Sequence, residues 1–269
     1  MTDVALTPAA ASRWRSLISV EMLVRIAAGV AILLVWEIAV RLWGPNFVAR
    51  PSRIVAVFPD TITNPALWEA FGQTMGSVVQ GLAIAVVVGT AIGLAIGRIP
   101  VVERLLTLYV NGLFAMPMVA ILPLLTLWFG YTGDARLATV VFAAIFAIIV
   151  NVSDGARAVP PEYVEVSRSF RGSGWSRLFD VILPASVPYL LAGLRLAAGR
   201  ALIGAVVAEF FAALPGIGFY ILFNTRAFRH NEAFVAVAML AVTGVLFEFV
   251  LAKATARFLP WYRRDEVRD

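Results

Sequence analysis

Residues 74–96 read TMGSVVQGLAIAVVVGTAIGLAI and contain no Asp, Glu, Lys or Arg. An α-helix needs about 20 mostly apolar residues to cross the hydrocarbon core of a bilayer. This stretch therefore predicts a membrane-spanning helix. Similar apolar stretches elsewhere in the chain bring the expected number of spans to about six, and they lie at 25–43, 105–129, 137–150, 188–213 and 233–251.

The composition agrees with a chain whose main solvent is lipid. Of its 269 residues, 61% are hydrophobic and 14% are charged, whereas soluble domains have about 45–50% apolar and about 25% charged residues. This small number of polar residues cannot cover the outside of a soluble fold of this length. The excess apolar surface must therefore face lipid. We expect an all-α, multi-pass membrane protein.

Composition also excludes several kinds of site. The chain has no Cys and only one His, His230, so the usual zinc sets, disulfides and Cys nucleophiles are unavailable, although a cation site made of carboxylates alone stays open. The single lysine, Lys253, follows no glycine-rich loop, so a phosphate-binding P-loop is absent. We expect no catalytic residue, no metal site and no cofactor in this chain. If the work of this chain is driven by ATP, another polypeptide must bring the ATPase.

The arginine distribution predicts the orientation, because short loops rich in Lys and Arg stay in the cytoplasm. Scattered basic residues of this kind also give no patch for nucleic acid. With an inside N-terminus, only six arginines fall outside: Arg41, Arg50, Arg53, Arg136, Arg226 and Arg229. The expected division is a cytoplasmic segment at 1–24, a transmembrane domain at 25–257 with a cytoplasmic loop at about 152–187, and a cytoplasmic tail at 258–269. The first span is long and carries Glu37, so we expect it to be retained rather than cleaved as a signal peptide.

The cytoplasmic loop is too long to be a simple connection. Val164, Ser167 and Phe170 recur every three residues, which favours a short amphipathic helix, and a second one is expected after a break at Gly172 to Gly174. The residues alone leave two interpretations open. The apolar face could lie on lipid headgroups, or it could dock on a partner protein.

At this loop the sequence resembles a known family. Glu165-Val166-Ser167, Arg171-Gly172 and Val181-x-Leu183-Pro184 are similar to the E-A-A-x-x-x-G-x9-I-x-L-P loop of the permeases of ATP-binding-cassette (ABC) importers. The resemblance is closest to the nitrate, sulfonate and taurine branch, and it extends from about Phe47 to the C-terminus. Further matches follow in the right order: Leu127-Trp128-Phe129-Gly130, Val152-Ser153-Asp154-Gly155-Ala156-Arg157, Gly193-Leu194-Arg195-Leu196 and Gly199-Arg200-Ala201.

The resemblance implies a type I importer permease with a MetI-like bundle. It implies pairing with a second permease copy, docking on two ATPase subunits, and delivery of the solute by an extracytoplasmic binding protein at the inner membrane. The solute would be a small anion such as nitrate, a sulfonate, taurine or bicarbonate, or alternatively a pyrimidine precursor or an aromatic acid. Apart from the resemblance, a stand-alone secondary transporter is the alternative function. The loop residues implied in coupling to the ATPase are Glu162, Glu165, Arg168, Phe170, Arg171, Gly172, Val181, Leu183 and Pro184.

The sequence departs from the family pattern at two places. Val166-Ser167 replaces the two alanines that follow the glutamate. Arg171 stands where the family usually has glycine, and Gly172 follows it. We expect Gly172 to end the first loop helix by adopting a positive φ.

Ionisable residues inside spans are unfavourable and therefore indicate function or pairing. If the fifth span enters the membrane from the cytoplasm near Pro188, a rise of about 1.5 Å per residue places Arg200 near the midplane. Arg200 then needs a partner such as Glu37 or Glu248, or a water-filled cavity. Two interpretations stay open, a buried ion pair and an anion path. The candidate path residues are Arg195, Arg200 and Glu209, although Arg195 could snorkel and Glu209 could be interfacial. Helix-breaking residues within the spans predict bent, closely packed helices, and they are Pro117, Pro123, Gly81, Gly89 and Gly93. We expect a packing kink at Met116-Pro117-Met118.

Overall fold

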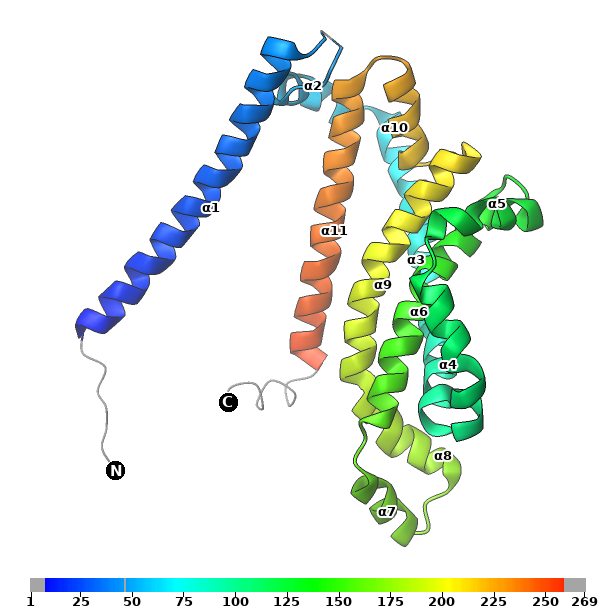
Figure 1. Cartoon of the computed structure of the whole chain (residues 1–269). Coiled ribbons are helices and arrows are strands. Elements are labelled where there is room, and N and C mark those ends of the chain that lie inside the picture. The colour runs from blue at the N-terminus through cyan, green and yellow to red at the C-terminus, as the bar shows by residue number, and fades with distance from the viewer. Residues whose placement is uncertain (1–7, 46, 259–269) are drawn as a thin grey trace.

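The helices of this chain run mostly along one direction, as the computed structural model shows for residues 8–45 and 47–258 (Figure 1). Within those residues there are helices and turns but no strand. The elements are α1 (Pro8–Trp43), α2 (Pro51–Ile62), α3 (Pro65–Arg98), α4 (Pro100–Ala115), α5 (Met118–Phe129), α6 (Gly133–Arg157), α7 (Pro161–Ser169), α8 (Gly174–Ser176), the π-helical η1 (Arg177–Ile182), α9 (Leu183–Ala212), α10 (Ile217–Arg226) and α11 (His230–Phe258).

Five helical segments are long and apolar enough to cross a membrane, and they lie at Met22–Trp43, Pro65–Arg98, Gly133–Arg157, Gly174–Ala212 and His230–Arg257. A sixth candidate consists of α4 and α5, which are bent by 103° at the break between them. The all-α fold with about six spans is thus confirmed.

The predicted span at 105–129 is broken into two helices, because the chain turns sharply inside it. Met116 has extended backbone angles, φ −69° and ψ 134°, which is the conformation that a following proline favours. Pro117 lacks the N–H that would continue the helix and serves as the N-cap of α5. The expected kink is therefore present, and it ends one helix and begins another.

Two other predicted boundaries differ. The fourth span is not short, because Thr132 accepts a hydrogen bond from the Asp134 N–H at its start and the helix continues to Arg157. The second loop helix is not separate either, since α8, η1 and α9 form one helical segment over Gly174–Ala212. The N–H of Leu183 donates to the carbonyl of Leu178, and this π turn carries the helix into Pro184.

The core lies where α3, α6 and α9 meet, and it includes Val78 and Ala85 of α3, Val140 and Ile148 of α6, and Ala201 of α9. Glycines of α3 face α6 at close range. A Cβ atom on Gly81 would lie 2.4 Å from Val140 Cγ1, one on Gly89 3.1 Å from Ile148 Cβ, and one on Gly93 2.8 Å from the Ile149 carbonyl oxygen. Small residues spaced in this way let helix backbones approach closely in membranes. The predicted close packing at these glycines is confirmed.

The two ends of the bundle are different. The start of α1, the end of α11 and the α7–α8 region lie at one end, and α2, α5 and α10 lie at the other (Figure 1). We call them the α7 end and the α10 end. Helix α1 leans away from the bundle toward the α7 end, and its Trp36 ring lies 5.3 Å from that of Phe234 on α11. That the α7 end faces the cytoplasm stays a prediction.

Candidate functional site

Helix α7 is held to the bundle by one buried face. Val164 is 8% exposed and belongs to a cluster with Ala156, Val159 and Ile182, against which Val181 also packs. The opposite face has no partner in the described chain, since Tyr163, Val166 and Phe170 are 60%, 55% and 84% exposed. Helix α7 thus combines a fixed position with a free apolar face.

The predicted coupling residues divide into an exposed set and a half-buried set. Those on the free surface are Glu162, Glu165, Arg168, Phe170 and Arg171, and Pro184 is exposed at the start of α9. Gly172, Val181 and Leu183 are half-buried beneath them. The structure therefore brings the motif residues together at one end of the molecule, while their role in coupling stays a prediction.

The turn after α7 corrects the prediction for Gly172. Arg171, not Gly172, adopts the left-handed backbone, with φ 57°. The N–H of Gly172 donates to the Ser167 carbonyl at 2.8 Å and that of Arg171 to the Arg168 carbonyl at 2.9 Å, which is the Schellman pattern that ends helices. Gly172 is needed for space, because its Cβ would lie 2.6 Å from Ser167 Oγ. The left-handed residue therefore stands at the position to which the family motif gives glycine.

Arg171→Gly is expected to stabilise this turn by about 0.5–1 kcal/mol, because the left-handed conformation is strained for a residue with a Cβ. Hydrogen exchange of the α7 amides should slow by about two- to fivefold. Gly172→Ala should accelerate the same exchange, since its Cβ has no room. Unchanged or faster exchange in Arg171→Gly would contradict this account of the turn.

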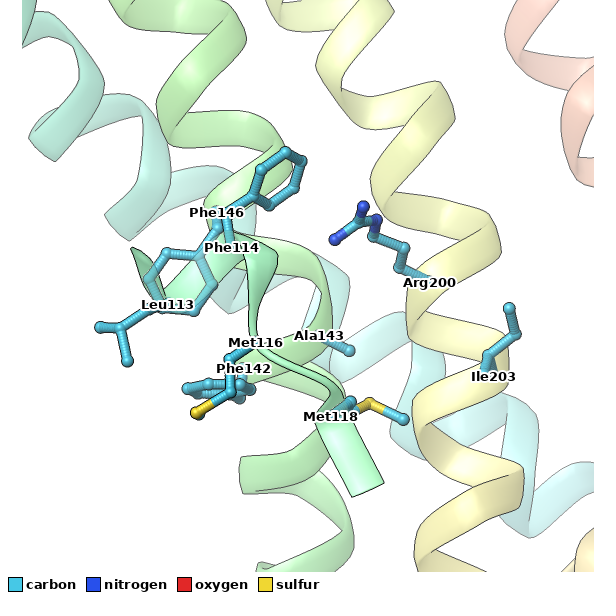
Figure 2. A pocket seen from close by; sticks show the side chains of 9 residues that line it. All are labelled: Leu113, Phe114, Met116, Met118, Phe142, Ala143, Phe146, Arg200 and Ile203. Carbon is cyan, nitrogen blue, oxygen red and sulfur yellow. The ribbon is translucent and has the colours of Figure 1, made fainter. Parts of the chain in front are cut away.

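Arg200 of α9 points into a cavity of about 130 Å³ beside the break between α4 and α5 (Figure 2). Its guanidinium carbon lies 4.1 Å from the centre of the Phe114 ring, within the range of a cation–π interaction. The remaining wall is apolar and includes Met116, Met118, Phe142 and Phe146. The kink that the sequence predicts therefore forms one side of a cavity whose wall includes the guanidinium of Arg200.

The predicted ion pair of Arg200 with Glu37 or Glu248 is not formed. Glu37 instead accepts hydrogen bonds from Arg41 and from the Ser52 N–H at 3.0 Å and hydroxyl at 2.7 Å, and no ion pair of the described residues includes Arg200. Arg195, the other predicted path arginine, is exposed on α9 and does not line the cavity.

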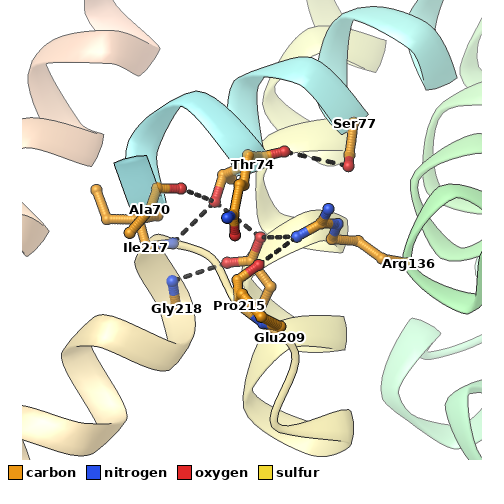
Figure 3. A network of polar contacts seen from close by, with 9 residues as sticks. Ala70, Thr74, Ser77, Arg136, Glu209, Pro215, Ile217 and Gly218 are labelled. Carbon is orange, nitrogen blue, oxygen red and sulfur yellow. Dashed lines mark hydrogen bonds and ion pairs between the residues drawn. The ribbon is translucent and has the colours of Figure 1, made fainter. Parts of the chain in front are cut away.

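Glu209 is completely buried near the α10 end (Figure 3), so the interfacial interpretation is wrong. Thr74 Oγ1 donates to one carboxylate oxygen at 2.7 Å, and the Gly218 N–H donates to the other at 2.8 Å. Arg136 of α6 forms an ion pair with it at 3.3 Å. The carboxylate thus joins α3, α6, α9 and the start of α10.

The loop before α10 fits closely around this network. Thr74 accepts a hydrogen bond from the Ile217 N–H at 2.9 Å, and Arg136 donates to the Pro215 carbonyl at 2.5 Å. A Cβ on Gly216 would lie 2.1 Å from Glu209 Oε1, so only glycine fits there. Glu209 does not line the Arg200 cavity, and its assignment to a translocation path stays a prediction.

Sequence reasoning missed two members of this network. Arg136 was assigned only to an outer loop, and Thr74 only to the start of a span. The available signal was that both residues lie at the predicted outer ends of their spans, 74–96 and 137–150. No group of three or more His, Asp or Glu that could hold a metal ion occurs in the described residues.

Comparison with known proteins agrees with the fold and the loop. Residues 81–264 match the family described as binding-protein-dependent transport system inner membrane component. The aliphatic sulfonates transport permease protein SsuC of Escherichia coli (strain K12) is 30% identical over 88% of this chain and 92% of its own length. The formylaminopyrimidine transport permease protein ThiX of Halalkalibacterium halodurans is 27% identical over 87% of this chain and 94% of its own.

A solved structure has the same fold. The crystal structure of an amino acid ABC transporter with histidines superposes with a TM-score of 0.62 at 16% identity, and covers 78% of this chain and 100% of the matched chain. The family match extends over the α7 loop, the Arg200 cavity, and Glu209 with its partner Arg136. The chain therefore belongs to the binding-protein-dependent transport system inner membrane components, the membrane-spanning permeases of ABC importers.

Proposed function

We propose that α7 of this permease is the element through which a separate ATPase drives transport. The observation that carries the proposal is the combination of a buried anchor, Val164, with an exposed face that presents Tyr163, Val166 and Phe170 beside Glu162 and Glu165. Aromatic side chains of this kind often dominate the energy of protein interfaces. ATP and Mg²⁺ would bind the ATPase, and its closure would move α7 and, through Ile182 and Val181, the start of α9.

A second permease copy is proposed as the partner of α4. None of its residues is buried within one chain, and Val101, Leu105, Leu108 and Tyr109 are all more than 60% exposed. Two such surfaces can bury each other around a central path, in the closed symmetry that most oligomers adopt. An extracytoplasmic binding protein would deliver the solute at the α10 end, with the α7 end and both chain termini in the cytoplasm.

The proposed substrate is a small anion. Arg200 in its cavity supports this choice, as does the relative named for aliphatic sulfonates. A pyrimidine precursor is the second candidate, supported by the similarity to ThiX.

Glu165→Lys tests the coupling role. The change reverses a charge on the exposed face of α7, so we expect the affinity for the partner ATPase to fall about tenfold or more, with folding unaffected. The measurement is capture of the ATPase by the tagged permease in nanodiscs, together with ATP hydrolysis by the complex. Glu69→Lys is the matched control, since Glu69 is also exposed but lies near the start of α3. Equal capture by Glu165→Lys and Glu69→Lys would exclude α7 as the docking element.

A further inference from the structure

The charge of Arg200 has no counter-ion in the described chain. Among the described residues, none forms a hydrogen bond or an ion pair with its guanidinium. The guanidinium carbon lies 4.1 Å from the centre of the Phe114 ring. A cation held within a membrane-spanning helix is unfavourable unless another group or water compensates it. The N–H donors of Arg200 are therefore available to a ligand in the cavity.

The cavity has a composition that selects among anions. Arg200 is the only charged residue in its wall, which otherwise consists of apolar side chains such as Phe142, Phe146 and Met118. Its volume of about 130 Å³ is several times the roughly 10–15 Å³ that one water requires. A small organic molecule fits this space better than a single ion.

The balance between hydration and burial favours an anion with a hydrocarbon part. An inorganic anion such as nitrate would lose its water shell and gain only one guanidinium in return, because the wall has no other side-chain donor. An organic anion regains part of that loss by burying its apolar surface against the aromatic rings. One positive group in the wall matches one negative charge.

We propose that the Arg200 cavity is a selectivity site for organic monoanions, in which a sulfonate or carboxylate group pairs with the guanidinium and the hydrocarbon part lies against Phe142, Phe146 and Met118. The proposal rests on the importer function proposed above and names the substrate class. The guanidinium provides paired N–H donors that match the geometry of such acid groups.

The test measures binding by the full-length chain in nanodiscs, with benzenesulfonate as the probe. Its apparent affinity follows from the shift of the thermal unfolding midpoint with ligand concentration. We expect saturable stabilisation by benzenesulfonate, a much weaker effect of nitrate, and none from benzyl alcohol, which has the ring but no charge. Arg200→Gln should weaken benzenesulfonate binding roughly 10- to 100-fold through loss of a charge-assisted hydrogen bond. The matched control is Arg195→Gln, which removes an exposed arginine of the same helix and should bind as the original chain does.

A second variant keeps Arg200 and blocks the site. Ile203 lines the same cavity three residues further along α9, where Ile203→Glu places a carboxylate within reach of the guanidinium. It should fold and lose benzenesulfonate binding. Unchanged binding in either Arg200→Gln or Ile203→Glu, or equal stabilisation by benzyl alcohol, overturns the proposal.

The same variants separate this proposal from the importer function. Arg200→Gln and Ile203→Glu should still capture the ATPase, because the residues that line the cavity belong to α4, α5, α6, α9 and the α4–α5 break, and none belongs to α7. If the original chain binds no benzenesulfonate but captures the ATPase, the importer function stands and the selectivity site falls. If it binds benzenesulfonate but captures no ATPase, the coupling proposal fails alone.

Discussion

Replacing Arg136 by Gln is expected to lower the free energy of unfolding by about 3–5 kcal/mol, which is the usual cost of removing one partner of a buried ion pair. Glu209 is fully buried, and Arg136 is the only basic side chain among its described partners. The Thr74 hydroxyl and the Gly218 N–H would still donate to the carboxylate. Its negative charge, however, would be left uncompensated, and the Pro215 carbonyl would lose its donor.

Chemical unfolding of the purified chain in mixed micelles measures this loss. The double variant Arg136→Gln with Glu209→Gln should recover most of it, because an amide needs no counter-charge in the same hydrogen-bonding position. Arg41→Gln is the matched control. It also breaks an arginine–glutamate pair, but Arg41 is 57% exposed, and pairs of that kind contribute only about 0–1 kcal/mol. A loss at Arg136 no greater than at Arg41, or a double variant less stable than both single ones, would contradict the role given to this pair.

The spans could be predicted from the sequence because length and hydropathy are properties of each segment alone. The sharp turn between α4 and α5 could not be predicted from the sequence, although Pro117 predicted a kink there. A proline can either bend a helix or end it, and the packing of the surrounding helices decides between the two. The second loop helix was wrongly separated from α9 for a similar reason. Pro184 indicates a helix start, and only the π turn at Leu183 shows that the helix runs through it.

The candidate sites also divide into those that a local stretch of sequence predicts and those that depend on packing between helices. The α7 loop was predictable because its motif is local, although the chain does not follow the glycine rule at Arg171. The Glu209 network depends on pairs far apart in sequence, 73 residues for Arg136 and 135 for Thr74. Such pairs depend on the rotation of each helix about its axis, which hydropathy does not specify. Arg200 was correctly expected to need either a partner or a cavity, and packing decided between them.

Gly93→Leu is expected to destabilise the bundle by about 3 kcal/mol, the upper end of the usual cost of overpacking. A Cβ at this position would meet the Ile149 carbonyl oxygen at 2.8 Å and Val152 Cβ at 2.9 Å. The first of these atoms belongs to the backbone of α6 and cannot move away as a flexible side chain does. The two helices would have to separate, and the core around Ile148 would lose contacts along with them.

The same helix provides a control that isolates this contact. Gly76 is exposed, and a Cβ there would have no atom within 4 Å. Gly76→Leu therefore makes the same gain in helix propensity, up to about 1 kcal/mol, without the clash, and it should leave the unfolding free energy equal or higher. Val152→Ala should rescue Gly93→Leu only in part, because it removes the methyl groups but leaves the Ile149 carbonyl in place. Equal stability of the Gly76 and Gly93 variants, or full rescue by Val152→Ala, would show that backbone contact between α3 and α6 does not set the spacing of the bundle.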